Sequence, residues 1–267
     1  MVQEVDDFAA WSSEIIYFLN QQRSLLALQK AEKMKKQAFA DRYPYGIFSC
    51  IRTMGHIYKS RGNFDLSAQY YQEALDYMLK NMPDQDPSQL YSSLAEYYRN
   101  TQKDYATALD YCEKALKSAK TERNIAQAMI EKCLVLFRQG RIDEFNDCYK
   151  EAVQMADRCK LSASVSLLIA HISKNILDKQ YEQAHAHADQ LSEEGLQQHA
   201  YIYECAKDYP NAIKYLKKYH QQLDSTNNLL QLSDIAELNT QIGAERLKME
   251  NIQATSRYRI TLFSIVT

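Results

Sequence analysis

Residues 54–75 read MGHIYKSRGNFDLSAQYYQEAL, and this segment introduces a pattern that recurs along the chain. A Gly–Asn pair at 62–63 precedes Phe64, and small or apolar residues follow three, seven and ten positions later. These residues are Ser67, Tyr71 and Ala74. Offsets of three, four and three place side chains on one face of an α-helix. The segment therefore predicts a helix that starts near Phe64 and buries one face.

The same pattern occurs four more times, and an apolar or aromatic residue leads each copy. The copies are Tyr105, Ala108, Cys112 and Ala115; Ile142, Phe145, Tyr149 and Ala152; Tyr181, Ala184, Ala188 and Leu191; and Tyr209, Ala212, Leu216 and Tyr219. Counted from Phe64, the lead residues follow one another after 41, 37, 39 and 28 positions. Because a second apolar-periodic stretch precedes every copy, each unit is predicted to be an antiparallel pair of helices.

Small residues are predicted to set how closely the two helices of a unit approach each other. A small or apolar residue stands nine or ten positions before each lead: Gly55, Ala95, Cys133, Ile172 or Ala200. Gly62 and Gly140 stand two positions before their leads, where a tight turn between helices favours a positive φ. The turn of the second copy carries one extra residue.

The first copy resembles the tetratricopeptide repeat, whose consensus has Leu-Gly, Tyr, a Gly-aromatic turn and spaced alanines. The second copy is nearly as similar, whereas Asn175 and Lys179 replace the Tyr and Gly of the consensus in a later one. Residues 8–40 resemble a further, degenerate copy of the repeat, with Ala27, Ala31 and Met34 at repeat-like offsets. The resemblance implies an all-α fold, a right-handed α-α superhelix of five to six helix pairs with a long C-terminal helix. An unrelated helical array is the alternative.

Composition supports a helical chain and excludes several functions. The 267 residues include only 6 Gly and 4 Pro, against roughly 19 and 13 at average usage, so a turn-rich β fold is disfavoured. A net charge of −2 gives no global attraction to nucleic acid or anionic lipid. The six cysteines form no C-x-x-C pair, and their spacing matches no zinc framework. Most lie within helical apolar periodicity, which predicts small buried hydrophobic residues, although the even count also permits disulfides.

Motifs that would carry catalysis are missing from the sequence. We find no phosphate-binding glycine loop, no G-x-S-x-G and no H-E-x-x-H. His185 and His187 are two positions apart, so on a helix they point in different directions and do not chelate one metal ion. The sequence therefore predicts a protein that is not an enzyme and that uses no cofactor or metal.

If the pairs stack as in the family, the first helix of each pair lines a concave groove that binds a protein or peptide. The positions that the family directs into this groove are Arg52, His56, Lys59, Arg99, Asn100, Ile130, Leu134, Phe137, Ile169 and Tyr201. The cationic members would meet a carboxylate or another anion. The apolar members either contact a partner or are covered by the chain itself. The carboxylate clamp of chaperone-binding repeats is disfavoured, because only Arg52 fits its five positions.

Residues 225–259 are predicted to form a long polar helix with one apolar stripe. Ile235, Leu238, Ile242, Met249 and Ile252 fit the a and d positions of one heptad frame. This helix either caps the last repeat or forms a homodimer that transmits a signal. Residues 260–267 are mostly apolar but too few for a bilayer span of about 20 residues. They are either the end of a packed helix or the start of a truncated membrane helix.

The layout of this C-terminal part resembles the extracytoplasmic repeat region of Bacteroidetes-type sensor proteins, which carry a histidine kinase or helix-turn-helix output. The resemblance implies a solenoid at 1–224, a connecting helix at 225–259 and a membrane segment that begins at 260–267. It also implies a sensory input region at the periplasmic face of the inner membrane. A free-standing cytoplasmic scaffold for protein–protein interaction is the alternative.

Overall fold

The computed structural model describes residues 2–21, 23–161, 164–192, 194–231 and 233–234, and their regular structure is entirely helical. The described residues fall into two compact units, one made of those up to residue 30 together with those from 224 to 234, and one made of those in 31–223. In the first unit, α1 (Val2–Asn20) buries Ile15, and its Glu14 pairs with Lys30 of α2 (Ser24–Ala40). Residues 31–40 of α2 belong to the second unit, and Ala31 and Met34, which stand at repeat-like offsets in the sequence, are buried there.

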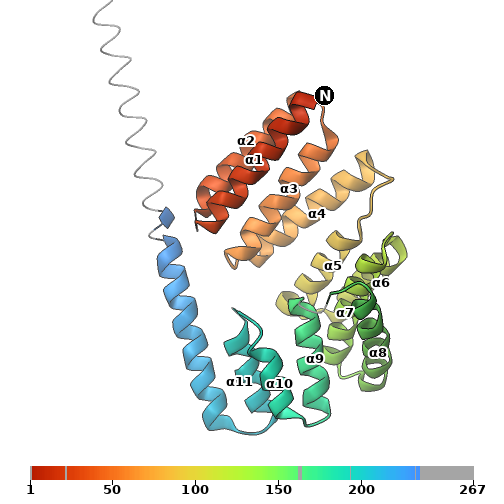
Figure 1. Cartoon of the computed structure of the whole chain (residues 1–267), viewed down its shortest axis with the longest axis vertical. Coiled ribbons are helices and arrows are strands. Elements are labelled where there is room, and N and C mark those ends of the chain that lie inside the picture. Colours follow the sequence, from red (N-terminus) through yellow and green to blue (C-terminus); the bar gives the residue numbers. More distant parts are fainter. Residues whose placement is uncertain (1, 22, 162–163, 193, 232, 235–267) are drawn as a thin grey trace, which may run out of the picture. The chain divides into compact units, whose positions relative to one another are not determined.

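The second unit is a series of helix pairs that follow one another along the chain (Figure 1). The pairs are α3 (Pro44–Ser60) with α4 (Phe64–Asn81); α5 (Ser88–Tyr97), continued by η1 (Tyr98–Gln102), with α6 (Tyr105–Ser118); α7 (Glu122–Gln139) with α8 (Ile142–Arg158); α9 (Val165–Leu177) with α10 (Tyr181–Ala188); and α11 (Gly195–Cys205) with helical residues 209–223. The first helices α5, α7 and α9 also contact one another in that order. This is the architecture of a helical solenoid, so the predicted fold class is confirmed.

Each second helix begins at the lead residue of the sequence pattern. Phe64, Tyr105, Ile142 and Tyr181 are the first residues of α4, α6, α8 and α10, and the last helix begins at position 209. Short polar side chains just before two of these leads cap the helices. Asn63 Oδ1 accepts from the Leu66 backbone N–H at 3.2 Å, and Asp104 Oδ1 accepts from the Thr107 N–H at 3.1 Å.

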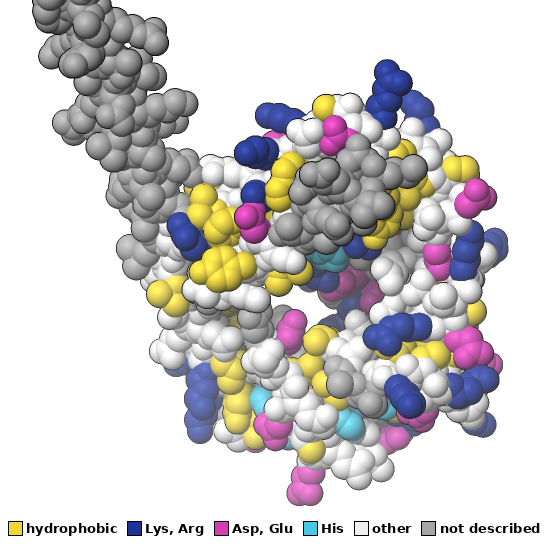
Figure 2. Space-filling view, turned by 45° about the horizontal axis from the view of Figure 1, so that its top comes forward, with side chains coloured by type: hydrophobic (Ala, Val, Ile, Leu, Met, Phe, Trp, Pro, Cys, Tyr) yellow, Lys and Arg dark blue, Asp and Glu magenta, His cyan; other side chains and the backbone are white. Residues whose placement is uncertain are grey.

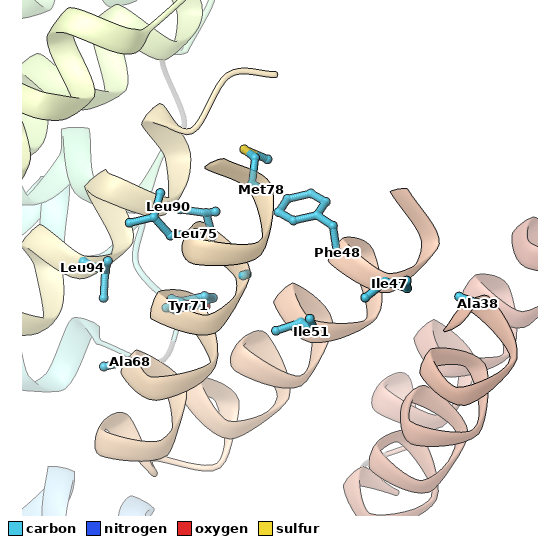
Figure 3. Packing of buried hydrophobic residues seen from close by; sticks show 11 residues of the cluster. Ala38, Ile47, Phe48, Ile51, Ala68, Tyr71, Leu75, Met78, Leu90 and Leu94 are labelled. Carbon is cyan, nitrogen blue, oxygen red and sulfur yellow. The ribbon is translucent and has the colours of Figure 1, made fainter. Parts of the chain in front are cut away.

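Gly55 permits the close packing of the first pair. A Cβ atom at this position would lie 2.7 Å from Cε1 of Tyr71, which comes from α4 and is itself buried. The surrounding cluster draws on α2 to α5, and Figure 3 shows Phe48 of α3 and Met78 of α4 pointing toward each other. The structure thus confirms that a small residue on the first helix makes room for the second helix.

The turn inside each pair places one residue in the left-handed region. Gly62 and Gly140 have φ of 72° and 73°, which confirms the predicted positive φ. Lysine takes the corresponding place in the remaining turns: Lys103, Lys179 and Lys207 have φ of 53°, 59° and 62°. An L-residue in this region costs about 1–2 kcal/mol, so the repeat tolerates strain where the glycine of the consensus is missing.

The extra residue in the second turn is absorbed by a π-helical turn. Helix α5 ends at Tyr97, and η1 continues it over Tyr98–Gln102 before Lys103 takes the left-handed conformation. A wider turn accommodates one more residue without shifting the start of α6. The insertion therefore changes the direction of side chains in η1 rather than the packing of the pair.

Several sequence predictions concern residues outside the described part of the chain. Among them are the apolar stripe at Ile235, Leu238, Ile242, Met249 and Ile252 and the segment 260–267. Within the described ranges, no helix combines the length and apolar character that a membrane crossing needs.

Candidate functional site

A cavity of about 270 Å³ opens between the first helices of successive pairs. Its lining includes Arg52, His56, Gln89, Glu96, Gln127 and Ser166, which come from α3, α5, α7 and α9. Arg52 and His56 are among the groove positions that the sequence predicts. The space-filling view shows a hollow with acidic, basic and histidine side chains around it (Figure 2). The cavity wall combines polar side chains with apolar surface, to which Leu90 and Ile130 contribute.

Arg52 brings a positive charge to this cavity that no carboxylate of the described residues neutralises. Its guanidinium carbon lies 5.3 Å from the centroid of the Phe48 ring, so the flat group rests against an aromatic face. The Nε atom is buried and has no hydrogen-bond partner within the described part of the chain. A buried donor without a partner costs about 1–3 kcal/mol, and a ligand that accepts from it would recover this energy.

His56 is neutral at physiological pH although it stays accessible from the cavity. Its Nδ1 and the Tyr71 hydroxyl oxygen are 2.9 Å apart and share a hydrogen bond. Removal of the imidazole from bulk water, together with the positive charges of Arg52 and Lys59, lowers the pKa of His56 to about 4. Burial raises the pKa of Tyr71 to about 12. The pair therefore supplies neutral hydrogen-bonding groups beside Arg52, not a second charge.

Lys59 pairs with an acidic residue of the next repeat. Its Nζ donates to Glu96 Oε2 at 2.6 Å, which links α3 to α5 at a half-exposed position. The sequence predicted Lys59 as a groove cation that meets an anion. The anion that it meets in the structure belongs to the chain itself.

Arg99 is buried, in contrast to the groove-facing position that the sequence predicted. Its Nε donates to Glu131 Oε1 at 2.6 Å and its Nη2 to Glu131 Oε2 at 3.2 Å. Arg99 is 6% exposed and Glu131 is 4% exposed. Burial opposes the charge of Arg99, but the Glu131 carboxylate outweighs this effect and raises the pKa of the guanidinium. Asn100 is exposed, and its Oδ1 accepts from Arg99 Nη1 at 2.7 Å.

The apolar part of the predicted groove lies largely in the core. Ile130 and Leu134 are 1% and 2% exposed and belong to the cluster formed by α7, α8 and α9. Phe137 and Ile169 are partly buried against the same cluster. Because α9 packs onto α7, the chain itself covers Ile130 and Leu134. For these two residues, coverage by the chain holds rather than contact with a partner.

Tyr201 of α11 meets a cation of α7 rather than standing free. The Arg138 guanidinium carbon lies 4.9 Å from the centroid of its ring. Burial raises the pKa of the Tyr201 hydroxyl to about 12, so the side chain stays protonated. This contact joins two first helices that are two repeats apart and leaves the Tyr201 ring less accessible than the sequence predicted.

Sequence reasoning missed two residues that shape the cavity wall. The repeat pattern predicts only a packing role for Tyr71, but its hydroxyl also reaches His56 and it lines the cavity. Glu131 lines the cavity and holds Arg99. The sequence does hold a signal for Glu131, because this acidic residue stands between Ile130 and an apolar run that begins at Cys133. A carboxylate in such a place is rarely buried unless it has a partner.

The histidines of α9 to α11 pair across helices. His185 stacks on His199 with ring centroids 4.9 Å apart, and His187 stacks on His171 at 5.0 Å. The two side chains thus point to different partners, as the helical spacing indicated. The described residues contain no group of three His, Cys, Asp or Glu side chains placed to hold a metal ion.

Comparison with known proteins agrees with this architecture. The family model of the tetratricopeptide repeat matches residues 52–86, which begin in α3 and run through α4. The chain contains a tetratricopeptide repeat. No curated protein matches the sequence.

Two solved structures show the same tetratricopeptide-type fold. The structure of PilW, a widely conserved type IV pilus biogenesis factor, has a TM-score of 0.53 and 13% identity, and the match covers 84% of this chain and 98% of PilW. PilF of Pseudomonas aeruginosa has a TM-score of 0.50 and 11% identity, with 86% of this chain and 99% of PilF covered. Identities this low establish the fold alone. Tetratricopeptide-type domains are typically non-catalytic scaffolds that bind other proteins.

Proposed function

We propose that this tetratricopeptide scaffold binds an acidic segment of a partner protein in the cavity between α3, α5, α7 and α9. The proposal rests on one observation: Arg52 lines the cavity and has no carboxylate partner among the described residues. The neighbouring cations differ in this respect, because Lys59 and Arg99 are each paired within the chain. Among the described residues, the cavity therefore offers one positive charge that no carboxylate compensates.

A carboxylate is the group that satisfies Arg52 best. A charge-assisted hydrogen bond from a guanidinium to a carboxylate is short and about twice as strong as a neutral one. The surrounding amides of Gln89 and Gln127 and the hydroxyls of Ser92 and Ser166 offer donors and acceptors for a peptide backbone. The volume of about 270 Å³ suits one or two side chains of an extended segment rather than a whole helix.

Selection from a random peptide library on the immobilised protein tests this proposal. We expect the recovered peptides to be enriched in Asp and Glu, and we expect Arg52→Gln to abolish that enrichment. Arg123→Gln is the matched control, because Arg123 is exposed at the start of α7 and does not line the cavity. Loss of one charged hydrogen bond is worth about 1.5–3 kcal/mol, so a selected peptide should bind the Arg52 variant about 10- to 150-fold more weakly. Equal binding by the two variants would refute the site.

We further propose that the scaffold is the sensory input region of a bacterial membrane-anchored signalling protein and lies on the periplasmic side. Only the sequence layout of the C-terminal part supports this role. The alternative is a cytoplasmic scaffold that carries the same binding site. Membrane fractionation of the protein expressed from its native gene separates the two, since recovery in the cytoplasmic fraction alone would rule out the sensor. Sedimentation with and without residues 225–267 tests the homodimer that the connecting helix would form.

A further inference from the structure

Two cysteines face each other across the helix pair formed by α7 and α8. The Sγ atoms of Cys133 and Cys148 are 2.8 Å apart. Cys133 lies six positions before the last residue of α7, and Cys148 lies six positions after the first residue of α8. Because the helices are antiparallel and share one short turn, equal spacing on both sides brings the two side chains to the same level.

The distance between the two sulfur atoms is unusual among the cysteines of this chain. A disulfide bond measures about 2.05 Å, so the sulfurs are about 0.8 Å from bonding distance and closer than van der Waals contact. Cys50 and Cys112 are buried, and Cys159 and Cys205 are half-buried. None of these four has a second sulfur within hydrogen-bond distance in the described part of the chain. The close pair is therefore a specific feature and not a general consequence of many cysteines.

The surroundings make one member of the pair the more reactive thiol. Cys133 is 0% exposed, whereas Cys148 is half-buried and reachable from solvent. The Cys133 S–H donates to the Cys148 sulfur, and this hydrogen bond lowers the pKa of Cys148, with further help from the nearby charge of Lys132. By contrast, burial raises the pKa of Cys50 to about 12. Attack on an oxidant would start at Cys148, since the thiolate is the nucleophile.

We propose that Cys133 and Cys148 form a dithiol modification site that low-molecular-weight disulfides convert into a bond between α7 and α8. The Cys148 thiolate attacks one sulfur of the small disulfide and releases the other half as a thiolate. Cys133 then loses its proton and attacks the Cys148 sulfur of the mixed disulfide, which releases the second small thiolate. One disulfide is reduced to two thiols, and the two protein thiols are oxidised to one disulfide.

The bond would stiffen the helix that lines the proposed cavity. Helix α7 carries Gln127, Ile130 and Glu131, and Cys133 lies half a turn beyond Glu131. A bond between positions 133 and 148 closes a loop of about 15 residues, which restricts the unfolded chain. We expect the Tm of the oxidised protein to exceed that of the reduced protein by roughly 5 °C or more.

Incubation of the purified full chain with oxidised glutathione, followed by alkylation and mass spectrometry, tests the site. The expected product has lost two hydrogen atoms, and its proteolytic map joins the peptides that hold Cys133 and Cys148. Dithiothreitol should reverse both the mass change and the rise in Tm. The variant Cys148→Ser should show neither effect, whereas the matched control Cys159→Ser, which removes a half-buried cysteine at the end of α8, should behave like the parent protein.

Three results would overturn the proposal. One is a stable glutathione adduct on Cys148 while Cys133 stays reduced. A second is a cross-link that involves any other cysteine, and a third is complete resistance to oxidised glutathione while Cys148 is readily alkylated. The peptide selection with Arg52 variants is independent of this chemistry, so the modification site and the acidic-peptide site can fail separately.

Discussion

The buried pair of Arg99 and Glu131 allows a quantitative test of how the second and third repeats are held together. The side chains of Arg99 and Glu131 are 5% and 6% exposed, and two hydrogen bonds join them. Removal of one partner leaves the other charge buried without compensation, which costs about 3–5 kcal/mol. Since a domain is stabilised by only about 5–15 kcal/mol in total, Arg99→Met or Glu131→Leu should each remove a large share of the stability.

The double variant should behave very differently from the single ones. Arg99→Met with Glu131→Leu removes both charges together and fills the space with apolar groups. Replacement of a buried ion pair in this way is often neutral or stabilising by about 1–4 kcal/mol. Asn100 loses a donor in this variant, but its side chain is exposed and water can take the place of Arg99. We therefore expect a strongly favourable coupling between the two substitutions.

Urea unfolding followed by circular dichroism and by tyrosine fluorescence measures these free energies. Agreement of the two signals justifies a two-state treatment, which a solenoid does not guarantee. Lys59→Met is the matched control, because it breaks the Lys59–Glu96 pair, whose side chains are 41% and 32% exposed. A pair this accessible is worth about 0–1 kcal/mol. If Arg99→Met costs no more than Lys59→Met, or if the double variant is as unstable as the single ones, the assignment of a buried pair is refuted.

Three further predictions concern packing, turn strain and pH. Gly55→Ala should lower the free energy of unfolding by about 1–3 kcal/mol in urea titration, because its Cβ would meet the Tyr71 ring at 2.7 Å; an unchanged midpoint would show that the helices can separate freely. Lys207→Gly should raise the free energy of unfolding by a few tenths of a kcal/mol or more, because glycine removes the left-handed strain at this position but loses more backbone entropy on folding. The control Lys214→Gly, inside the last helix, should lower the free energy of unfolding. Burial lowers the pKa of His171, His185 and His187, so the folded state takes up protons less readily than the unfolded state, whose histidines titrate near 6.5. Stability should therefore be constant above that pH and fall as the pH decreases from about 6.5 to 5.5; equal urea midpoints at pH 7.5 and 5.5 would contradict this.

Local features of the fold could be predicted from the sequence because they depend on short-range geometry. The leads Phe64, Tyr105, Ile142 and Tyr181 mark helix starts, since each follows a turn and opens an apolar face. A positive φ at Gly62 follows from the turn itself. These properties are encoded within a few residues and do not depend on how one pair is rotated against the next.

Which residues form the site depends on how each helix pair is rotated against the next pair. A single sequence does not encode this rotation directly. Helical counting directs Arg99 into the groove, but this residue belongs to η1, where the π-helical turn breaks the periodicity of 3.6 residues. Likewise, α9 packs onto the side of α7 that carries Leu134, so that residue enters the core. Arg52 lies in a regular part of α3, and there the counting places it in the cavity lining.

The contrast between Arg52 and its neighbours gives the cavity its chemical character. Glu96 and Glu131 are each engaged by a cation of the preceding repeat, so the two carboxylates in the lining are already neutralised. These pairs join α3 to α5 and η1 to α7, and α3, α5 and α7 all contribute residues to the cavity wall. An incoming carboxylate therefore meets Arg52 without net repulsion from the wall. It also meets a wall that the buried pair holds in position, so the cost of ordering that wall is met when the chain folds rather than when the partner binds.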